Sequence, residues 1–424
     1  MAPRDLVEAF GGTASKCMHK ILLISDGHGE DWVAAQIAIH LLRLGQQRHY
    51  EPIELIALPM VGDGHSYERV GVPLAAATRI LPSGGFTFKT LRGLWLDLRS
   101  GLTGYGNHLL RSVNKLADWT DLVLAVGDIL PLGLAWMTRK PYIFVGCTKS
   151  DYYTGGARSC YFPWERALMQ PPRCLHAFTR DRITCCNLRL HRVAASYGGN
   201  PMMDGLEEQP GDAAIRSAGP FVGLLPGSRP GEAQRNLADM LLCLEAMQRQ
   251  LAAPVHFEAA ISAGLGLESF RRLARSSGWQ DLGDGRLMRG GAVVFLRTDN
   301  FNNVLHRADL LVAMAGTATE QAVGLGKPVI AFPGQGPQFT RRFARLQRQL
   351  LGESVQIVEV APARRPEAVA RLAQSLLRDS ERLLRIRSNG RERMGSAGGA
   401  AQIAEFVLNQ LPQRLYGGSP RSRS

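Results

Sequence analysis

The stretches LLPGSR (residues 224–229) and AGTATE (315–320) decide how this chain folds. Each follows an apolar run that predicts a buried strand (221–225 and 310–314), and each precedes a helix-like sequence. A strand that ends in a small-residue turn before a helix presents backbone N–H groups and a positive dipole end, which bind phosphate. Either turn alone could be an ordinary connection in an α/β sheet. Together, one with an arginine and one with a glutamate, they predict a site for a nucleotide diphosphate with its ribose.

Strands and helices alternate along most of the chain, which predicts parallel sheets of the α/β class. In the N-terminal half the expected strands are 20–25, 53–58, 122–126, 141–146 and 176–179, with helices at 32–44 and 181–190. The pattern begins again near Pro220, with expected strands at 221–225, 255–260, 292–296, 309–314, 328–332 and 355–359. Because 424 residues exceed the usual size of one domain, we expect two.

The expected domain boundaries follow from these patterns. We expect a flexible leader over residues 1–19, an N-terminal domain over 20–205, a linker over 206–219, a C-terminal domain over 220–413 and a disordered basic tail over 414–424. The tail is rich in glycine, serine and arginine, a composition that cannot bury enough apolar surface to fold.

The composition narrows the possible partners and the compartment. A net charge of +13 can attract nucleic acid, anionic lipid or phosphorylated substrates. The chain has no zinc finger, aromatic RNA-binding motif or basic zipper, so we expect no nucleic-acid partner. The seven cysteines are scattered without metal-binding spacing, which indicates a reducing cytoplasm and no metal site. No segment reaches the roughly 18 apolar residues that span a bilayer, and residues 1–20 lack the apolar core of a secretory signal.

The C-terminal half resembles the lipid-A-disaccharide synthases, which are glycosyltransferases of the GT-B class. Besides the two opening stretches, the matching residues are Glu232, Gln321-Ala322 and GNPMMD at 199–204. A related branch in cyanobacteria and plants is similar through GHGED at 27–31 and GPQFT at 336–340. The resemblance implies two Rossmann-like domains that face each other across a cleft, with a helical C-terminal segment.

The resemblance also implies a UDP-sugar donor on the C-terminal domain, with no cofactor and no metal ion. Protein groups must then stabilise the leaving diphosphate. Arg229 suits this task because guanidinium offers bidentate donors to phosphate. By resemblance, Glu320 would contact the ribose and Gln338 the donor sugar; the alternatives are a solvated arginine, a surface carboxylate and a helix-capping glutamine. The full expected donor site is Gly227, Ser228, Arg229, Gly316, Thr317, Glu320 and Gln338.

The N-terminal half departs from the family pattern. The family's Asp-x-Pro-Asp phrase reads Asp128-Ile129-Leu130-Pro131 here, so the second aspartate, thought to be catalytic, is absent. Asn200 stands in place of a family histidine, and the turn after the first strand reads His28-Gly29-Glu30-Asp31. We therefore expect an acceptor different from the lipid A precursor.

The acceptor hydroxyl needs a base that works near neutral pH. The candidates are His28, Asp31 and Asp128, each in a turn that follows an expected strand. An imidazole can accept the proton directly, and a carboxylate can accept it or orient the group that does. Alternatively, Glu30 and Asp31 only stabilise the first turn of the following helix.

Residues 86–119 interleave apolar and basic side chains. An apolar stripe flanked by cations can rest on an anionic bilayer. The alternative is a helix that packs on the core of the N-terminal domain with its charges in water. We expect a cytoplasmic protein in peripheral contact with the inner face of the membrane, where a lipid or lipid-linked acceptor would lie. The expected membrane-docking residues are Phe86, Phe88, Lys89, Leu91, Arg92 and Trp95.

The leading hypothesis is therefore a glycosyltransferase that moves a sugar from a UDP-sugar to a lipid or lipid-linked acceptor. Two alternatives stay open. One is a UDP-sugar 2-epimerase of the same fold, which has no need of the membrane-docking segment. The other is a non-catalytic nucleotide- or lipid-binding protein that retains only the donor site.

Overall fold

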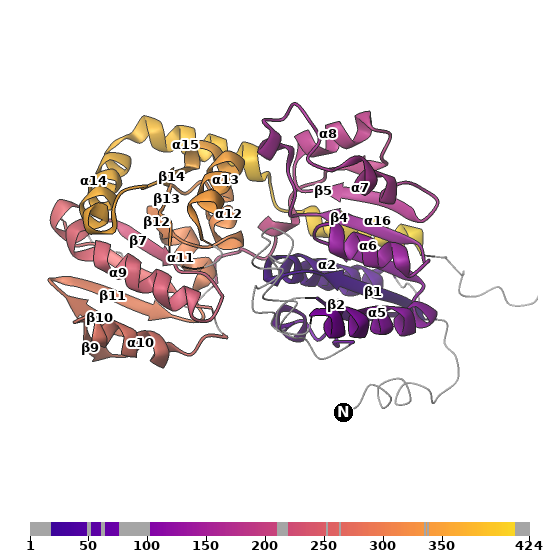
Figure 1. Cartoon of the computed structure of the whole chain (residues 1–424), viewed down its shortest axis with the longest axis horizontal. Helices are drawn as coiled ribbons and strands as arrows, with labels where there is room; N and C mark the ends of the chain where they lie inside the picture. The colour runs from indigo at the N-terminus through magenta and orange to yellow at the C-terminus, as the bar shows by residue number, and fades with distance from the viewer. Residues whose placement is uncertain are drawn as a thin grey trace, which may run out of the picture. The chain divides into compact units, whose positions relative to one another are not determined.

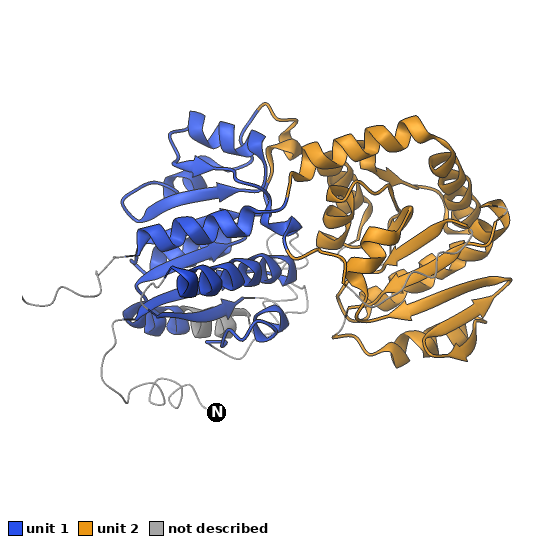
Figure 2. Ribbon diagram, turned by 180° about the vertical axis from the view of Figure 1, so that it is seen from behind, with its two compact units in different colours: residues 1–149, 158–204, 397–424 blue, residues 150–157, 205–396 orange. Residues whose placement is uncertain are grey.

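The chain divides into two compact units, each built around its own sheet (Figure 2). Unit 1 comprises residues 1–149, 158–204 and 397–424, and unit 2 comprises 150–157 and 205–396. Both units are Rossmann-like, which confirms the expected α/β fold class. The structure, a computed structural model, describes residues 18–48, 52–60, 64–75, 102–209, 219–251, 253–262, 264–334, 336 and 339–411.

The sheet of unit 1 is parallel throughout, in the order β2-β1-β3-β4-β5-β6 (Figure 1). From β1 the chain first adds β2 on one side and then β3 on the other, so the strand order reverses between β1 and β3. Ligands of open α/β sheets bind outside the carboxyl ends of the strands at such a point. The strands are β1 (His19–Ser25), β2 (Ile53–Pro59), β3 (Leu122–Val126), β4 (Tyr142–Gly146), β5 (Cys174–Thr179) and β6 (Ala195–Ser196).

Helices cover the sheet of unit 1 and bury its apolar strands. The core includes Leu22 and Ile24 of β1, Val123 and Ala125 of β3, and Phe144 of β4. The helices are α2 (His28–Gln47), α3 (His65–Glu68), α5 (Leu102–Trp119), α6 (Ile129–Met137), α7 (Pro163–Leu168), α8 (Arg182–Leu190), the 3-10 turn η3 (Pro201–Met203) and α16 (Gly399–Gln410).

The sheet of unit 2 has the order β14-β13-β12-β7-β8-β11-β10-β9. Its six parallel strands, taken in chain order, run 3-2-1-4-5-6, the order of dinucleotide-binding folds. The order reverses between β7 and β12, and the LLPGSR and AGTATE stretches lie at the carboxyl ends of these two strands. The strands are β7 (Phe221–Leu225), β8 (His256–Ala260), β9 (Gln280–Gly283), β10 (Arg286–Arg289), β11 (Ala292–Arg297), β12 (Leu310–Ala313), β13 (Val329–Ala331) and β14 (Val355–Ile357).

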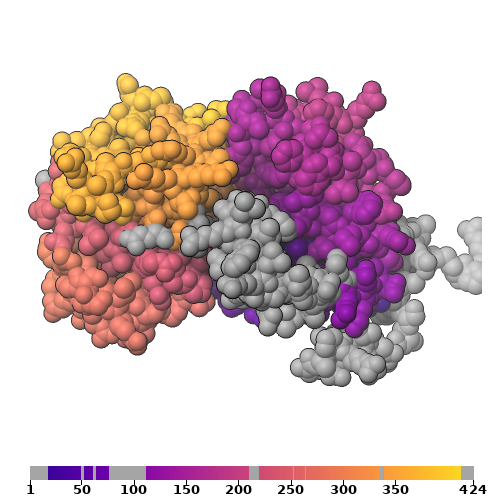
Figure 3. Space-filling view, in the orientation of Figure 1, coloured from indigo at the N-terminus to yellow at the C-terminus, as the bar shows by residue number. Residues whose placement is uncertain are grey.

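Helices also flank the sheet of unit 2, and those near its C-terminal end form the orange and yellow surface in Figure 3. The segment 150–157, which contains η2, belongs to this unit because it packs against α13. The helices are η2 (Asp151–Thr154), α9 (Glu232–Leu251), α10 (Leu267–Ser276), α11 (Phe301–Arg307), α12 (Thr317–Gly324), α13 (Arg341–Leu351), η4 (Gly352–Ser354), η5 (Pro362–Arg364), α14 (Arg365–Arg378) and α15 (Ser380–Met394).

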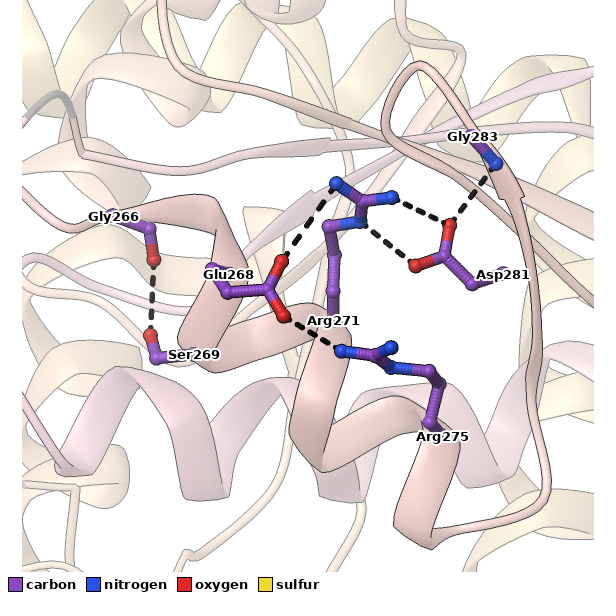
Figure 4. A network of polar contacts seen from close by, with 7 residues as sticks. All are labelled: Gly266, Glu268, Ser269, Arg271, Arg275, Asp281 and Gly283. Carbon is purple, nitrogen blue, oxygen red and sulfur yellow. Dashed lines mark hydrogen bonds and ion pairs between the residues drawn. The ribbon is translucent and has the colours of Figure 1, made fainter.

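The antiparallel hairpin of β9 and β10 was not expected from the sequence. Its turn places Asp284 and Gly285 at φ 50° and 74°, the left-handed conformation of a tight hairpin turn. Ion pairs fasten it to α10: Arg271 donates two hydrogen bonds to Asp281 at 2.9 and 3.0 Å, and Glu268 contacts both Arg271 and Arg275 (Figure 4). The hairpin thus extends the sheet at the edge away from β12.

The last helix differs from the expected C-terminal domain of 220–413. Residues 397–411 belong to unit 1, because α16 packs against α2 and buries Ile403, Val407 and Leu408. The GNPMMD stretch holds its first turn: Asp204 accepts hydrogen bonds from the backbone N–H groups of Gly398 and Ala400. A Cβ at Gly399 would lie 2.6 Å from the carbonyl oxygen of Gly199, so only glycine permits this approach.

Candidate functional site

The two opening stretches meet at the switch point of unit 2. The backbone N–H of Met314, after β12, donates to the carbonyl of Leu225 at 2.9 Å, which fixes the second turn beside the first. Gly227 has φ 98°, and a Cβ there would lie 3.3 Å from the Met314 carbonyl oxygen. A side chain at this position would therefore strain the backbone and crowd the neighbouring turn.

A buried asparagine that the sequence reading missed ties the two turns together. Asn236 lies one turn into α9, and its Nδ2 donates to the carbonyls of Pro226 at 2.9 Å and Met314 at 3.3 Å. In the sequence it is one polar residue in an amphipathic helix, and no local signal marks it. Its contact with Met314 spans 78 residues, so only the fold reveals it.

The carbonyl groups of the second turn are also satisfied from within the unit. Gln347 of α13 donates to the carbonyls of Ala315 at 2.8 Å and Gly316 at 3.3 Å, and the Thr319 hydroxyl donates to Ala315 at 2.8 Å. Gly316 caps α12 without a side chain. The first backbone N–H groups of a helix have no partner inside it, so this turn offers them, with the helix dipole, to an anion.

The predicted donor residues occupy these two turns, with one exception. Gly227, Ser228 and Arg229 follow β7, and Gly316, Thr317 and Glu320 form the start of α12. Ser228 is exposed, whereas Arg229 and Glu320 are half-buried. Gln338 lies outside the residues that the structure describes.

A third loop, after β13, closes on the same turns. Glu232, at the start of α9, is buried and accepts a hydrogen bond from the backbone N–H of Phe339 at 3.0 Å. A Cβ at Gly336 would lie 2.2 Å from this carboxylate, and one at Gly334 would lie 2.5 Å from the Met314 side chain. The motif residue Glu232 thus holds the third loop against the first.

Unit 1 carries a pair of carboxyl groups at its own switch point. Asp26 follows β1 and Asp128 follows β3. Burial, the charges of Asp128 and Glu30, and a hydrogen bond with Asp128 raise the pKa of Asp26 well above its ordinary value. A Cβ at Gly127 would lie 1.9 Å from Asp26 Oδ1, so the carboxyl group rests against this glycine. The neighbouring carboxylates therefore favour the protonated form of Asp26, because a like charge beside a carboxyl group disfavours its ionised form.

The three predicted bases have different surroundings. Asp128 accepts a hydrogen bond from the backbone N–H of Leu130 at 2.9 Å, which caps α6. Asp31 is buried and accepts from the Ser25 hydroxyl, which also contacts the Tyr67 hydroxyl at 2.6 Å. His28 is exposed at the start of α2. Sequence reasoning missed Asp26, although an aspartate directly after a buried strand is a visible signal.

The expected membrane contact remains a prediction. Phe86, Phe88, Lys89, Leu91, Arg92 and Trp95 lie outside the described residues. Within the described ranges, every helix is too short or too polar to cross a lipid bilayer.

No protein-family model matches the chain. Among curated proteins, it is 29% identical over 240 residues to a lipid-A-disaccharide synthase of Alkalilimnicola ehrlichii, and 26% identical over 239 residues to one of Trichlorobacter lovleyi. Each match covers 52% of this chain, and 59% and 58% of the relatives, so the chain spans less than two thirds of their length. The resemblance to this family is thereby confirmed.

Solved structures show the same architecture. The calicheamicin glycosyltransferase CalG4 is 16% identical with a TM-score of 0.59, over 94% of this chain and all of that one. MnaA of S. aureus with UDP is 15% identical with a TM-score of 0.56, over 94% of this chain and 99% of that one. A UDP-N-acetylglucosamine 2-epimerase from Listeria monocytogenes, itself a putative assignment, is 15% identical with a TM-score of 0.55, over 92% and 96%. These likenesses show the GT-B fold.

Proposed function

We propose that this chain, a GT-B protein similar to lipid-A-disaccharide synthases, is a glycosyltransferase that moves a sugar from a UDP-sugar to a lipid or lipid-linked acceptor. The observation that carries the proposal is the meeting of the LLPGSR and AGTATE turns at the switch point of unit 2. The names of the curated relatives and the UDP bound to MnaA support the donor class.

The donor binds to unit 2 through its diphosphate and ribose. Backbone N–H groups at the start of α12 and the guanidinium of Arg229 carry the diphosphate charge, without a metal ion. Glu320 accepts hydrogen bonds from the ribose hydroxyls. As the bond between the sugar and the diphosphate breaks, its electron pair leaves with the diphosphate. Arg229 therefore acts most strongly on the leaving group.

Asp128 of unit 1 takes the proton of the acceptor hydroxyl. The oxygen then forms its bond to the anomeric carbon of the donor sugar. The raised pKa of Asp26 favours its protonated form, which can donate a hydrogen bond to Asp128 and keep that carboxylate oriented. The carboxylate of Asp31 is already bound to Ser25 in the interior, which makes it a weaker candidate. His28 is the second candidate base.

The relatives' name supports a lipid acceptor, and the location is part of the proposal. A lipid or lipid-linked acceptor would be met at the cytoplasmic face of a membrane, with the chain in peripheral contact.

The expected products distinguish the proposed glycosyltransferase from the two alternative functions. Transfer requires an acceptor, whereas an epimerase converts the UDP-sugar alone and a binding protein converts nothing.

Calorimetric titration with UDP tests the donor site. Arg229→Ala should weaken UDP binding about tenfold to a hundredfold, because it removes a charge-assisted hydrogen bond of about 1.5–3 kcal/mol. Glu320→Gln should abolish the preference for UDP over deoxy-UDP, which lacks the 2′-hydroxyl that the carboxylate binds. Arg272→Ala and Glu367→Gln change exposed residues of α10 and α14 and serve as controls. Unchanged UDP binding in Arg229→Ala would refute the donor site.

A turnover assay tests the base. With a UDP-sugar and a glycolipid extract, Asp128→Asn should lose transfer and retain UDP affinity. An epimerised UDP-sugar formed without any acceptor would instead identify the chain as an epimerase.

A further inference from the structure

Unit 1 exposes two aromatic side chains where the chain enters α7. Phe162 and Trp164 are 58% and 55% exposed, and their rings lie parallel, 5° apart in plane, with centroids 6.1 Å apart. Single exposed aromatic residues are ordinary on protein surfaces. Two parallel rings this close together differ because they expose a larger aromatic surface than either ring alone.

Buried groups hold this aromatic pair in place. Glu165 is fully buried and accepts hydrogen bonds from the backbone N–H of Phe162, at 2.8 Å, and from the ammonium of Lys149. That ammonium lies 5.5 Å from the Phe162 ring centroid and 5.3 Å from that of Tyr161. Tyr161 is buried and meets Phe144 of β4 edge to face, with centroids 6.2 Å apart. The exposed rings therefore stand on a support that reaches the sheet, as a binding surface requires.

A short chain of contacts links the aromatic pair to the carboxyl pair. Lys149 directly follows Thr148, whose hydroxyl donates to Glu30 at 3.0 Å. Glu30 lies in the first turn of α2, close enough to Asp26 to raise the pKa of that residue. The aromatic face and the proposed base thus belong to one end of the unit 1 sheet, beyond the carboxyl ends of β1, β3 and β4.

The charges in this region select the kind of ligand. Lys149 is paired with the buried Glu165, and Arg166 donates to the carbonyl oxygen of Tyr161 at 2.9 Å, so these two cations near the rings are already engaged. A phosphate group would have to compete with their partners, whereas an uncharged ligand would not. A pyranose ring has an apolar C–H face and a rim of hydroxyl groups, and ligand sites commonly combine aromatic walls with a few polar groups. The Lys149 ammonium, the Thr148 hydroxyl and the Glu30 carboxylate can bind such a rim.

We propose that Phe162 and Trp164 form the acceptor subsite of unit 1, where they stack an uncharged sugar ring. The inference rests on the proposed function and adds that the acceptor is a neutral glycoside. Tryptophan fluorescence and saturation-transfer NMR with a panel of methyl hexopyranosides test it directly, without turnover. The wild type should bind at least one of these sugars, and a hexose 6-phosphate more weakly than its neutral parent.

Variants locate the binding to this surface. Phe162→Ala and Trp164→Ala should each weaken binding of the neutral sugar about tenfold, since aromatic stacking contributes on the order of one such factor. Neither variant should change UDP affinity. Trp136→Ala is the matched control, because Trp136 is 44% exposed on α6, in the same unit, and lies against Arg173 rather than Lys149.

Several results would overturn the inference. They are no sugar binding by the wild type, unchanged sugar binding in both variants, or binding of the phosphorylated hexose as tight as that of the neutral one. Loss of binding to phosphatidylglycerol vesicles with sugar binding intact would make the surface a membrane contact instead. A wild-type protein that binds the neutral sugar but does not bind UDP would refute the proposed function and leave this subsite standing.

Discussion

Two glycines keep the switch points of the two sheets open. Gly127 follows β3 with φ 137°, and Gly227 follows β7 with φ 98°. A side chain at Gly127 would occupy the place of the Asp26 carboxyl group, and one at Gly227 would press on the Met314 carbonyl. At both points the missing side chain leaves room for polar groups that follow a neighbouring strand. Glycine therefore has the same role beside the carboxyl pair of unit 1 and in the proposed nucleotide-binding turn of unit 2.

The pH dependence of stability should report on Asp26. Its pKa is raised in the folded state above the ordinary value of 3.8, mainly by burial and then by Asp128. Between the two pKa values the folded state keeps a proton that the unfolded state has lost, so the free energy of unfolding falls as pH rises through this range. Asp26→Asn should remove this loss. At pH values above the folded-state pKa of Asp26, the variant should therefore have a higher melting temperature than the wild type.

Thermal unfolding from pH 4 to pH 8 measures the difference. Asp118→Asn, an exposed position on α5, is the control and should follow the wild type. If the melting temperature of Asp26→Asn had the same pH slope as that of the wild type, this would contradict a raised pKa of Asp26.

The candidate site shows which of its residues can be predicted from the sequence alone. Gly227, Arg229 and Gly316 could be placed in advance, because a strand, a small-residue turn and a helix are written in one short stretch. Asn236 and Gln347 could not be placed in advance. Asn236 lies near Pro226 in the sequence, but its contact with Met314 and both contacts of Gln347 span 31 or more residues. The contacts that hold a site in place come from packing between elements, and the spacing of residues in the sequence does not predict them.

Among the elements, α16 depends on a cap supplied from far along the chain. Its own N-cap residue, Gly398, makes no side-chain hydrogen bond, and Asp204 instead binds the N–H groups of Gly398 and Ala400. Asp204→Ala should therefore lower the free energy of unfolding by about 1–3 kcal/mol, the cost of leaving such groups unsatisfied.

Urea unfolding followed by circular dichroism measures this cost. Asp118→Ala, which removes an exposed carboxylate of α5, should stay within about 0.5 kcal/mol of the wild type. Equal midpoints for the two variants would show that α16 does not need the Asp204 cap.

Elements with strong periodicity were predictable, and those with mixed patterns were not. The apolar strands β1, β3, β7 and β12 were expected close to their observed bounds. The β9–β10 hairpin was missed because its strands are short and half-exposed, although Asp284-Gly285 is a hairpin signal. The placement of α16 in unit 1 was missed because an apolar helix face predicts burial but does not indicate which element packs against it.

At the scale of the whole molecule, neither unit is one continuous segment. The chain passes between the units after residues 149, 157, 204 and 396. Deletion of residues 397–424 should therefore weaken unit 1 and spare unit 2, since α16 packs on α2. Hydrogen exchange of peptides from α2 should rise markedly, while peptides from α9 should keep their protection.

A shorter deletion that ends the chain at Leu411 is the matched control and should leave α2 protected. If the longer deletion exposed α2 and α9 equally, the two units would not unfold separately. If it exposed neither, α16 would contribute nothing to unit 1.

The position of α16 in the sequence also affects the order in which the two units can fold during translation. The ribosome completes every strand of unit 1 before it begins β7, yet it makes the helix that covers α2 only after every strand of unit 2. Domains usually fold as they leave the ribosome, the N-terminal one first. Here α2 of the nascent unit 1 lacks the cover of α16 until unit 2 has been synthesised. Unit 2 can therefore reach its final structure first, and chaperones have a defined surface to protect in the interval.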